Sequence, residues 1–340
     1  MDRVSRYILS NFFPLFSSLF FTLFFLVSVI FFITLSRLTA LISVNFWDLS
    51  EIFLYAIPEI ISYTFPITFF IAIAMTVFSL SKDNEMIVLF ALSMNPAKIA
   101  RLFLGLSIIA SIFLLLNVIF FMPLSKQLSS NFIALKKMEA KLNFKESEFG
   151  QKFANWHVFV QSNTKNVYNN IVLYQRGVDG KEDKFILAKE AKLDRKDALV
   201  NFRLYDGKVF SLSKEKLTQV DYAKLKMSYN PKMHQLTSSE IIDYWEKAKS
   251  DPKRATQLAF SILIGLFPLA TFLYALSFGI AHMRHQKPNV YLNTMIVVLL
   301  YYVAIYKLAH KFPFYGTIGI FVFFSIVGMI VFKKRVLERF

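Results

Sequence analysis

Six long apolar segments, three before and three after a polar block, constrain the fold of this chain more than any other feature. They are Phe12–Leu35, Ile52–Leu80, Leu102–Met122, Gln257–Ile280, Val290–Ala309 and Tyr315–Phe332. Each has at least roughly the 18 residues that an α-helix needs to cross the hydrocarbon core of a bilayer. The sequence therefore predicts six transmembrane helices, three within residues 1–123 and three within residues 237–340.

The composition is typical of a membrane protein. Hydrophobic residues make up 55% of the chain, Phe alone accounts for 39 of its 340 residues, and charged residues make up only 18%. The first apolar segment is longer than the core of a signal peptide, and no small-residue cleavage pattern follows it, so we expect it to be retained as a span. The chain has no cysteine, which excludes disulfides and thiolate metal sites.

Lysine and arginine in the short loops predict the orientation of the spans. Cations cluster in the N-terminal tail, the loops after the second and fourth spans, and the C-terminal tail. The short loops on the opposite side contain only Arg37, Lys307 and Lys311. Both termini are therefore predicted to be cytoplasmic and the polar block to be periplasmic. Topology accounts for part of the net charge of +16, and the remainder suits an anionic partner rather than nucleic acid.

The polar block at residues 124–236 is predicted to be an all-β, jelly-roll-like domain. Short segments such as His157–Gln161 and Asn170–Tyr174 alternate apolar and polar residues, which is typical of half-buried strands. Asp179-Gly180 and Asp206-Gly207 are predicted to be the turns of hairpins. Six or more short strands favour an antiparallel sandwich, barrel or jelly roll. A helix over Ser125–Lys141 is expected to precede them, and an amphipathic connector over Ser238–Ser250 to follow them.

No motif for catalysis or for cofactor binding occurs in the chain. The nucleotide-binding patterns G-x-x-x-x-G-K-[ST] and G-x-G-x-x-G are absent, as are the zinc motif H-E-x-x-H and the hydrolase motif G-x-S-x-G. His282 and His285 fit a polar loop better than a metal site. The spans lack central charged residues, although Glu59 and Asn117 lie within them. We therefore expect neither an enzyme nor a cofactor, and any transport would be driven by a partner.

The loop after the second span, Ser81–Arg101, contains a short apolar helix predicted near residues 83–95. Asp83 and Asn84 can cap the helix, Glu85 suits its N-terminus, and Pro96 ends it. Two interpretations remain open. The helix can dock into a cytoplasmic motor subunit, or it can extend the second span or lie in the membrane interface.

Several short segments together resemble the LptF/LptG family, the permease subunits of the lipopolysaccharide export transporter. The resemblance covers essentially the whole chain. The segments are Arg6-Tyr7-Ile8, Ile57–Pro66, Asn84-Glu85 with the apolar run after it, Ile186–Asp194, Leu204–Phe210, Arg254 and Ala275–Gly279. The chain departs from the family at Ser93-Met94-Asn95, where a glycine is common. Ile57-Pro58-Glu59 resembles LptF, whereas the N-terminal segment and Ala275–Gly279 resemble LptG, so the paralogue stays open.

The resemblance implies a permease that pairs with its LptF/LptG paralogue on an LptB-like ATPase dimer. Lipopolysaccharide would enter a cavity between the two permeases from the outer leaflet of the inner membrane. It would then pass through β-jelly-roll domains to LptC- and LptA-like periplasmic proteins. The resemblance also implies that the ATPase contacts are Glu85, Met86, Leu89 and Phe90.

The expected lipid-binding residues are Arg37, Lys307, Lys311, Phe24 and Phe31. Arg37 is the best match to the basic residues that the family places near the outer end of the first span. Cations there would pair with the phosphates of the lipid, and phenylalanines of the first span would line its acyl path. The alternative is that the cations anchor the helices at the interface and that the phenylalanines face ordinary lipid.

Two other function classes also fit a membrane protein with an external β-domain. One is an ABC-type subunit for lipoprotein release or mechanotransmission, which usually has four spans rather than six. The other is an envelope assembly scaffold without transport, which predicts no nucleotide-dependent behaviour.

Overall fold

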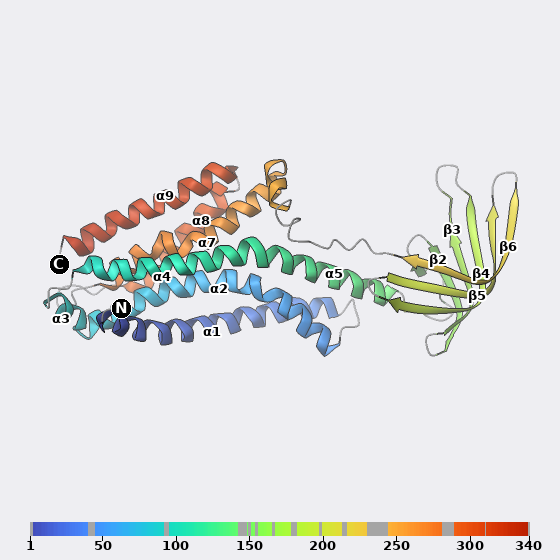
Figure 1. Ribbon diagram of the computed structural model, residues 1–340, viewed down its shortest axis with the longest axis horizontal. Coiled ribbons are helices and arrows are strands. Elements are labelled where there is room, and N and C mark those ends of the chain that lie inside the picture. Colours follow the sequence, from blue (N-terminus) through green and yellow to red (C-terminus); the bar gives the residue numbers. More distant parts are fainter. Residues whose placement is uncertain are drawn as a thin grey trace. The chain divides into compact units, whose positions relative to one another are not determined.

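The computed structural model describes residues 3–39, 45–91, 95–141, 148, 151–153, 156–164, 167–177, 182–196, 199–212, 216–229, 244–280, 289–309 and 311–338. The chain divides into two compact units. Both are drawn in Figure 1, where the colours follow the sequence. The helical unit contains Met1–Ser36, Ser50–Leu128 and Leu236–Phe340. The second unit contains Ser129–Gln235 and also Arg37–Leu49, a segment between the first two spans.

Among the described residues, six helices are long and apolar enough to cross a membrane, by length and composition. The prediction of six membrane helices with an inserted β-domain is therefore confirmed. The helical elements are α1 (Arg3–Thr39), α2 (Phe46–Lys82), α3 (Glu85–Ala91), α4 (Pro96–Leu116), η1 (Asn117–Phe121), α5 (Met122–Lys141), η2 (Lys247–Lys249), α7 (Pro252–Gly279), α8 (Val290–Ala304), η3 (Ile305–Ala309), α9 (Pro313–Phe332) and η4 (Lys333–Leu337).

Side-chain caps explain where two of the spans begin. The side chain of Asn95 accepts a hydrogen bond from the Ala97 amide, and Pro96 takes the first helical position of α4. Asp251 caps α7 in the same way, with Pro252 next to it. A capping oxygen followed by proline suits a helix start, because the first amides have no partner within the helix.

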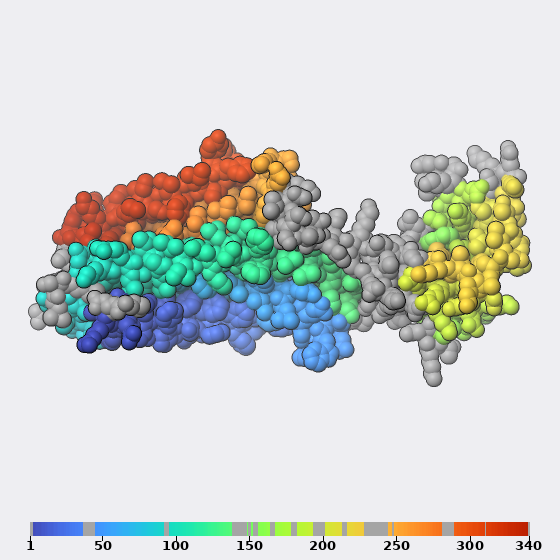
Figure 2. Space-filling model, viewed as in Figure 1, coloured from blue at the N-terminus to red at the C-terminus, as the bar shows by residue number. Residues whose placement is uncertain are grey.

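The core of the helical unit is formed mainly by α2 and α7. In each of them 67% of the most apolar window is buried, compared with 11% in α1, 28% in α8 and 22% in α9. Tyr301 of α8 is fully buried, stacks edge-on against Phe267, and donates its hydroxyl proton to the Leu263 carbonyl oxygen over 2.8 Å. Helices α1, α4 and α9 are all visible on the face that Figure 2 presents. Most of the apolar surface of α1, α8 and α9 is therefore left for lipid or for another protein.

The second unit contains a six-stranded antiparallel sheet in the order β1-β2-β3-β4-β5-β6. Its strands are β1 (Gln151–Phe153), β2 (Trp156–Thr164), β3 (Val167–Gln175), β4 (Asp183–Lys196), β5 (Leu199–Leu212) and β6 (Leu217–Tyr229). The predicted all-β domain is confirmed. Consecutive strands pair throughout, so among the described residues the sheet is a meander. The prediction of a turn at Asp206-Gly207 is wrong, because both residues lie in the middle of β5. Asp179-Gly180 lies outside the described residues.

A row of four residues without ladder partners crosses the sheet, and we call this row the crease. Gln161, Asn170, Lys189 and Asp206 face one another across β2 to β5, and none of them has a ladder partner. Asn170 and Asp206 have φ angles of 48° and 46°, a left-handed conformation that Asn and Asp tolerate better than most residues. Figure 1 shows that the strands of the sheet are bent along their length.

Side-chain alternation inverts at the crease. On β3, Tyr168 and Ile171 are both buried although they are three residues apart, and the same is true of Ala188 and Ala191 on β4. In a regular strand, residues three apart point to opposite faces. The inversion keeps the apolar side chains of both halves on one face, where they form the core of the sheet.

Gly207, next to the crease, allows a close approach between three strands. A Cβ atom at this position would overlap the Leu187 carbonyl oxygen and the Tyr222 hydroxyl. That hydroxyl donates a hydrogen bond of 2.8 Å to the Leu187 carbonyl, across β5. Burial raises the pKa of Tyr222 to about 12, so the hydroxyl keeps its proton at neutral pH.

Candidate coupling helix and polar contacts of the helical unit

Helix α3 is separate from α2. The backbone of Asn84 has a φ angle of 60°, which turns the chain out of the helical path directly after α2 ends at Lys82. The carbonyl of the same asparagine then accepts from the Val88 amide at the start of α3. A left-handed residue is a common way to end a helix. The short helix is therefore not an extension of the second span, and docking on a motor subunit and a position in the membrane interface both stay open.

A hydrogen bond joins α3 to the first span. The hydroxyl of Tyr7 donates to Oε2 of Glu85 over 2.7 Å. Glu85 was expected to contact a partner, and here its side chain is half-buried with one oxygen held by α1. The sequence offered no local signal for this pair, because its members are 78 residues apart.

The other predicted coupling residues differ in exposure. Met86 is only 2% exposed and belongs to the core of the helical unit, so its side chain packs within the chain and offers no docking surface. Leu89 and Phe90 are half-buried against the same core. Val88, which sequence reasoning missed, is 57% exposed. It lies three residues from Glu85 on the same side of the helix, but no local pattern marks that side as the exposed one.

The predicted lipid-binding residues are not joined to one another by contacts among the described residues. The side chain of Arg37 lies outside the described part of the structure. Lys307 in η3 and Lys311 are exposed, and the latter has its Nζ 5.6 Å from the ring centre of Phe312. Phe24 and Phe31 are half-buried, with their ring centres 5.7 Å from Phe20 and 6.3 Å from Phe53, respectively.

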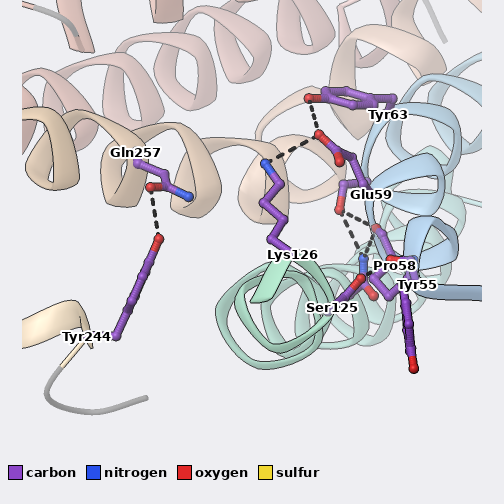
Figure 3. Close-up of polar contacts among 10 residues, drawn as sticks. Tyr55, Pro58, Glu59, Tyr63, Ser125, Lys126, Tyr244 and Gln257 are labelled. Atoms are coloured by element: carbon purple, nitrogen blue, oxygen red, sulfur yellow. Dashed lines mark hydrogen bonds and ion pairs between the residues drawn. The ribbon is translucent and has the colours of Figure 1, made fainter. Parts of the chain in front are cut away.

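A charged pair connects α2 with α5 (Figure 3). Nζ of Lys126 lies 3.3 Å from Oε1 of Glu59, and the Tyr63 hydroxyl donates to the same oxygen over 3.3 Å. The two charged side chains are 36% and 43% exposed, which fits a partly solvated position near the end of a span. Glu59 stands out in the sequence as a charged residue within a span, whereas Lys126, four residues after the third apolar segment, does not.

The π-helical turn η1 brings a second set of polar groups to α2. Nδ2 of Asn117 donates to the Pro58 carbonyl over 2.8 Å and to Oγ of Ser62 over 3.0 Å. Ser125 donates to the Tyr55 carbonyl nearby (Figure 3). Within hydrocarbon, such bonds satisfy groups that water cannot reach. Asn117 therefore fixes the third span against the second where a π-turn interrupts the regular helix.

We expect Asn117→Leu to lower the free energy of unfolding by about 0.6–1.7 kcal/mol, which is between the average and the maximum for hydrogen bonds between membrane helices. Ser62 keeps its own bond to the Pro58 carbonyl, so no acceptor on α2 is left alone. Thermal unfolding in detergent measures the change. Asn11→Leu is the matched control, because Asn11 is exposed and bonds only within α1. Equal shifts for the two variants would contradict the role of Asn117.

The segment before α7 is held by an aromatic and cationic cluster. The guanidinium of Arg254 lies 4.4 Å from the ring centre of Tyr244 and donates to the Tyr244 carbonyl over 3.2 Å. The Tyr244 hydroxyl bonds Gln257 (Figure 3), and the indole of Trp245 donates to the Ile119 carbonyl over 2.9 Å. Only residues 244–250 of the predicted amphipathic connector are described, and 244–249 are helical. The cluster fastens these residues to the first turn of α7 and to η1.

Comparison with known families gives one match over almost the whole chain. A family model described as "Lipopolysaccharide export system permease LptF/LptG" matches residues 6–334. No curated protein matched the chain. The match spans both sets of three membrane helices and the β-domain between them, which is the architecture of this structure. The protein is thus a multi-pass membrane subunit of a lipopolysaccharide export system, and the chain belongs to the LptF/LptG permease family.

Proposed function

We propose that this chain lifts lipopolysaccharide out of the outer leaflet of the inner membrane, driven by a separate LptB-like ATPase that docks on α3. The observation that carries this proposal is the attachment of α3. The helix is short and separate, it exposes Val88 beside Glu85, and its other face is anchored in the core through Met86. Because the Tyr7–Glu85 bond also fastens it to α1, a force on α3 would reach the first span directly.

The proposed partner within the membrane is the paralogous permease of the same family. The low burial of α1 and α8 supports this pairing, since both helices present wide apolar surfaces. We place the lipid cavity between these surfaces and those of the partner. Phe24 and Phe31 would line its wall, and Arg37, Lys307 and Lys311 would pair with phosphates at its outer end. Docking on the ATPase would involve Glu85, Leu89 and Phe90, with Val88 added and Met86 acting as the buried anchor.

The β-domain is proposed to receive the lipid in the periplasm and to pass it to LptC- and LptA-like proteins. Exposed apolar side chains of the sheet, among them Leu212, Leu217 and Val220, support this role because acyl chains outside the membrane need an apolar surface to contact.

The composition of the complex tests the proposed function. Native mass spectra of gently extracted complexes should show this chain with one paralogue, two ATPase subunits and a bound lipopolysaccharide mass. A complex that contains periplasmic proteins but never an ATPase would favour the scaffold alternative instead.

The proposed orientation can be tested with two single-cysteine variants, because the natural chain has no cysteine. Lys216 precedes β6 and Lys98 lies in the first turn of α4, and both side chains are exposed. In intact spheroplasts a membrane-impermeant maleimide should label Lys216→Cys and leave Lys98→Cys unmodified until the cells are lysed. The reverse pattern would invert the topology and overturn the assignment of α3 to the cytoplasm.

A further inference from the structure

An apolar groove of about 490 Å³ lies between α4, α7 and α9. Ala100 and Leu104 of α4, Leu273 of α7, and Phe321 and Met329 of α9 form much of its wall. Leu104 and Met329 are 37% and 58% exposed, so the groove is part of the surface of the helical unit. Its volume is within the range of ligand-binding pockets.

The groove has a cation on its rim. Arg101 is among its lining residues and is exposed, and Ser325 is the other polar side chain of the lining. Among the described residues, no carboxylate lies within ion-pair distance of Arg101. An apolar groove with an unpaired guanidinium in its lining matches a ligand with a hydrocarbon chain and an anionic head.

More positive charge gathers at the same end of the helical unit. Lys98 lies three residues before Arg101, and Lys333 and Lys334 follow α9 in η4, which contacts α4. The next residue, Arg335, places its guanidinium 5.4 Å from the ring centre of Phe278 at the end of α7. Residues 96–101 and 333–338 together contain one acidic residue, Glu338. The local charge is therefore strongly positive.

We propose that this groove binds an anionic glycerophospholipid of the surrounding leaflet, with one acyl chain between α4, α7 and α9 and its phosphate at Arg101. All three helices are membrane spans, so lipid is the solvent that meets the groove. A net negative headgroup is favoured over a zwitterionic one, because the amine of the latter would face the surrounding lysines.

The proposal concerns a site apart from the residues proposed to hold the exported lipid. Lys307 and Lys311 lie at the opposite end of α8 and α9 from the groove rim. One part of this inference rests on the proposed function, namely which leaflet supplies the phospholipid. With both termini in the cytoplasm, it is the cytoplasmic leaflet. Because the groove lies beside the first turns of α4, the bound phospholipid would pack against the helix that directly follows the coupling loop.

Lipid retention tests the site. The complex is reconstituted in nanodiscs of phosphatidylethanolamine and phosphatidylglycerol and is then released from them in the mass spectrometer. The number of molecules of each phospholipid that stay bound to the complex is counted. Wild type should retain phosphatidylglycerol above its share of the bilayer. Arg101→Gln should weaken that retention about fivefold, the effect of one cation near an anionic lipid. Lys253→Gln, which also replaces an exposed cation by glutamine but near the start of α7, should leave it unaltered.

A second variant tests the groove rather than the charge. Ala100→Phe places a ring among the lining side chains and should reduce retention of both phospholipids, with a thermal melt to verify that the chain is folded. Unchanged phosphatidylglycerol retention in both Arg101→Gln and Ala100→Phe would overturn the proposal. Retention by the single chain that disappears in the two-permease complex would also overturn it, because a protein would then cover the groove. Loss of the ATPase from the wild-type spectra would instead count against the proposed function and leave this site intact.

Discussion

A chain carrying Val88→Arg should bind the ATPase about 30-fold more weakly than wild type, as expected when about 2 kcal/mol is lost at the centre of an interface. Val88 is the one exposed large apolar side chain of α3, and a charge there would have to be desolvated on docking. The fold should survive, since the substituted side chain has few contacts to lose. Pull-down of the ATPase from detergent extracts, followed by titration of the purified components, measures the change.

Two matched variants separate docking from positioning. Glu85→Arg should weaken the ATPase complex similarly, because it reverses a charge on the same side of α3. Tyr7→Phe removes only the hydrogen bond to Glu85 and keeps the ring, so ATPase binding should stay within about twofold of wild type, the scale of a weak exposed interaction. Full ATPase binding by both Val88→Arg and Glu85→Arg would sink the docking assignment of α3.

Replacing Gly207 should have the largest effect on the β-domain. The added Cβ of Gly207→Ala would overlap the Leu187 carbonyl oxygen and the Tyr222 ring, both fixed by their own hydrogen bond. Overpacking of this kind costs about 1–3 kcal/mol, and here the nearest atom is backbone, so we expect the upper part of that range. Hydrogen exchange of peptides from β4, β5 and β6 in the full-length protein should accelerate.

Asp206→Gly is the control for Gly207→Ala. Residue 206 already has a φ angle of 46°, a conformation that glycine adopts freely, so this change should leave exchange in the three strands near wild type. If Gly207→Ala exchanged like wild type while Asp206→Gly exchanged faster, the close approach at Gly207 would not be what fixes the crease.

The membrane spans were predictable because length and hydropathy alone specify them. A run of about 20 apolar residues has few alternatives to a membrane helix, since the backbone must satisfy its own hydrogen bonds in lipid. The strands were predictable in type but not in extent. Asp-Gly is a strong hairpin signal, and the inversion of alternation at Asp206 makes one long strand look like two short ones.

The candidate site was only partly predictable for a different reason. The position of α3 follows from Asn84 and Pro96, which are local signals. Which side of a seven-residue helix is buried depends on what it packs against, so the sequence could not show that Met86 is inside and Val88 outside. The partners of Glu85 and Glu59 come from other helices, and such pairs leave no trace in a local pattern.

The crease across the sheet has a mechanical consequence. Along the row from Gln161 to Asp206 the neighbouring strands share no ladder pair, so bending about this line disrupts none of the pairs on either side. The sheet therefore has a compliant axis between two stiff panels. The angle between the panels sets how closely the apolar side chains of the two halves pack on their shared face. A small change in that angle alters this packing while every paired residue keeps its register.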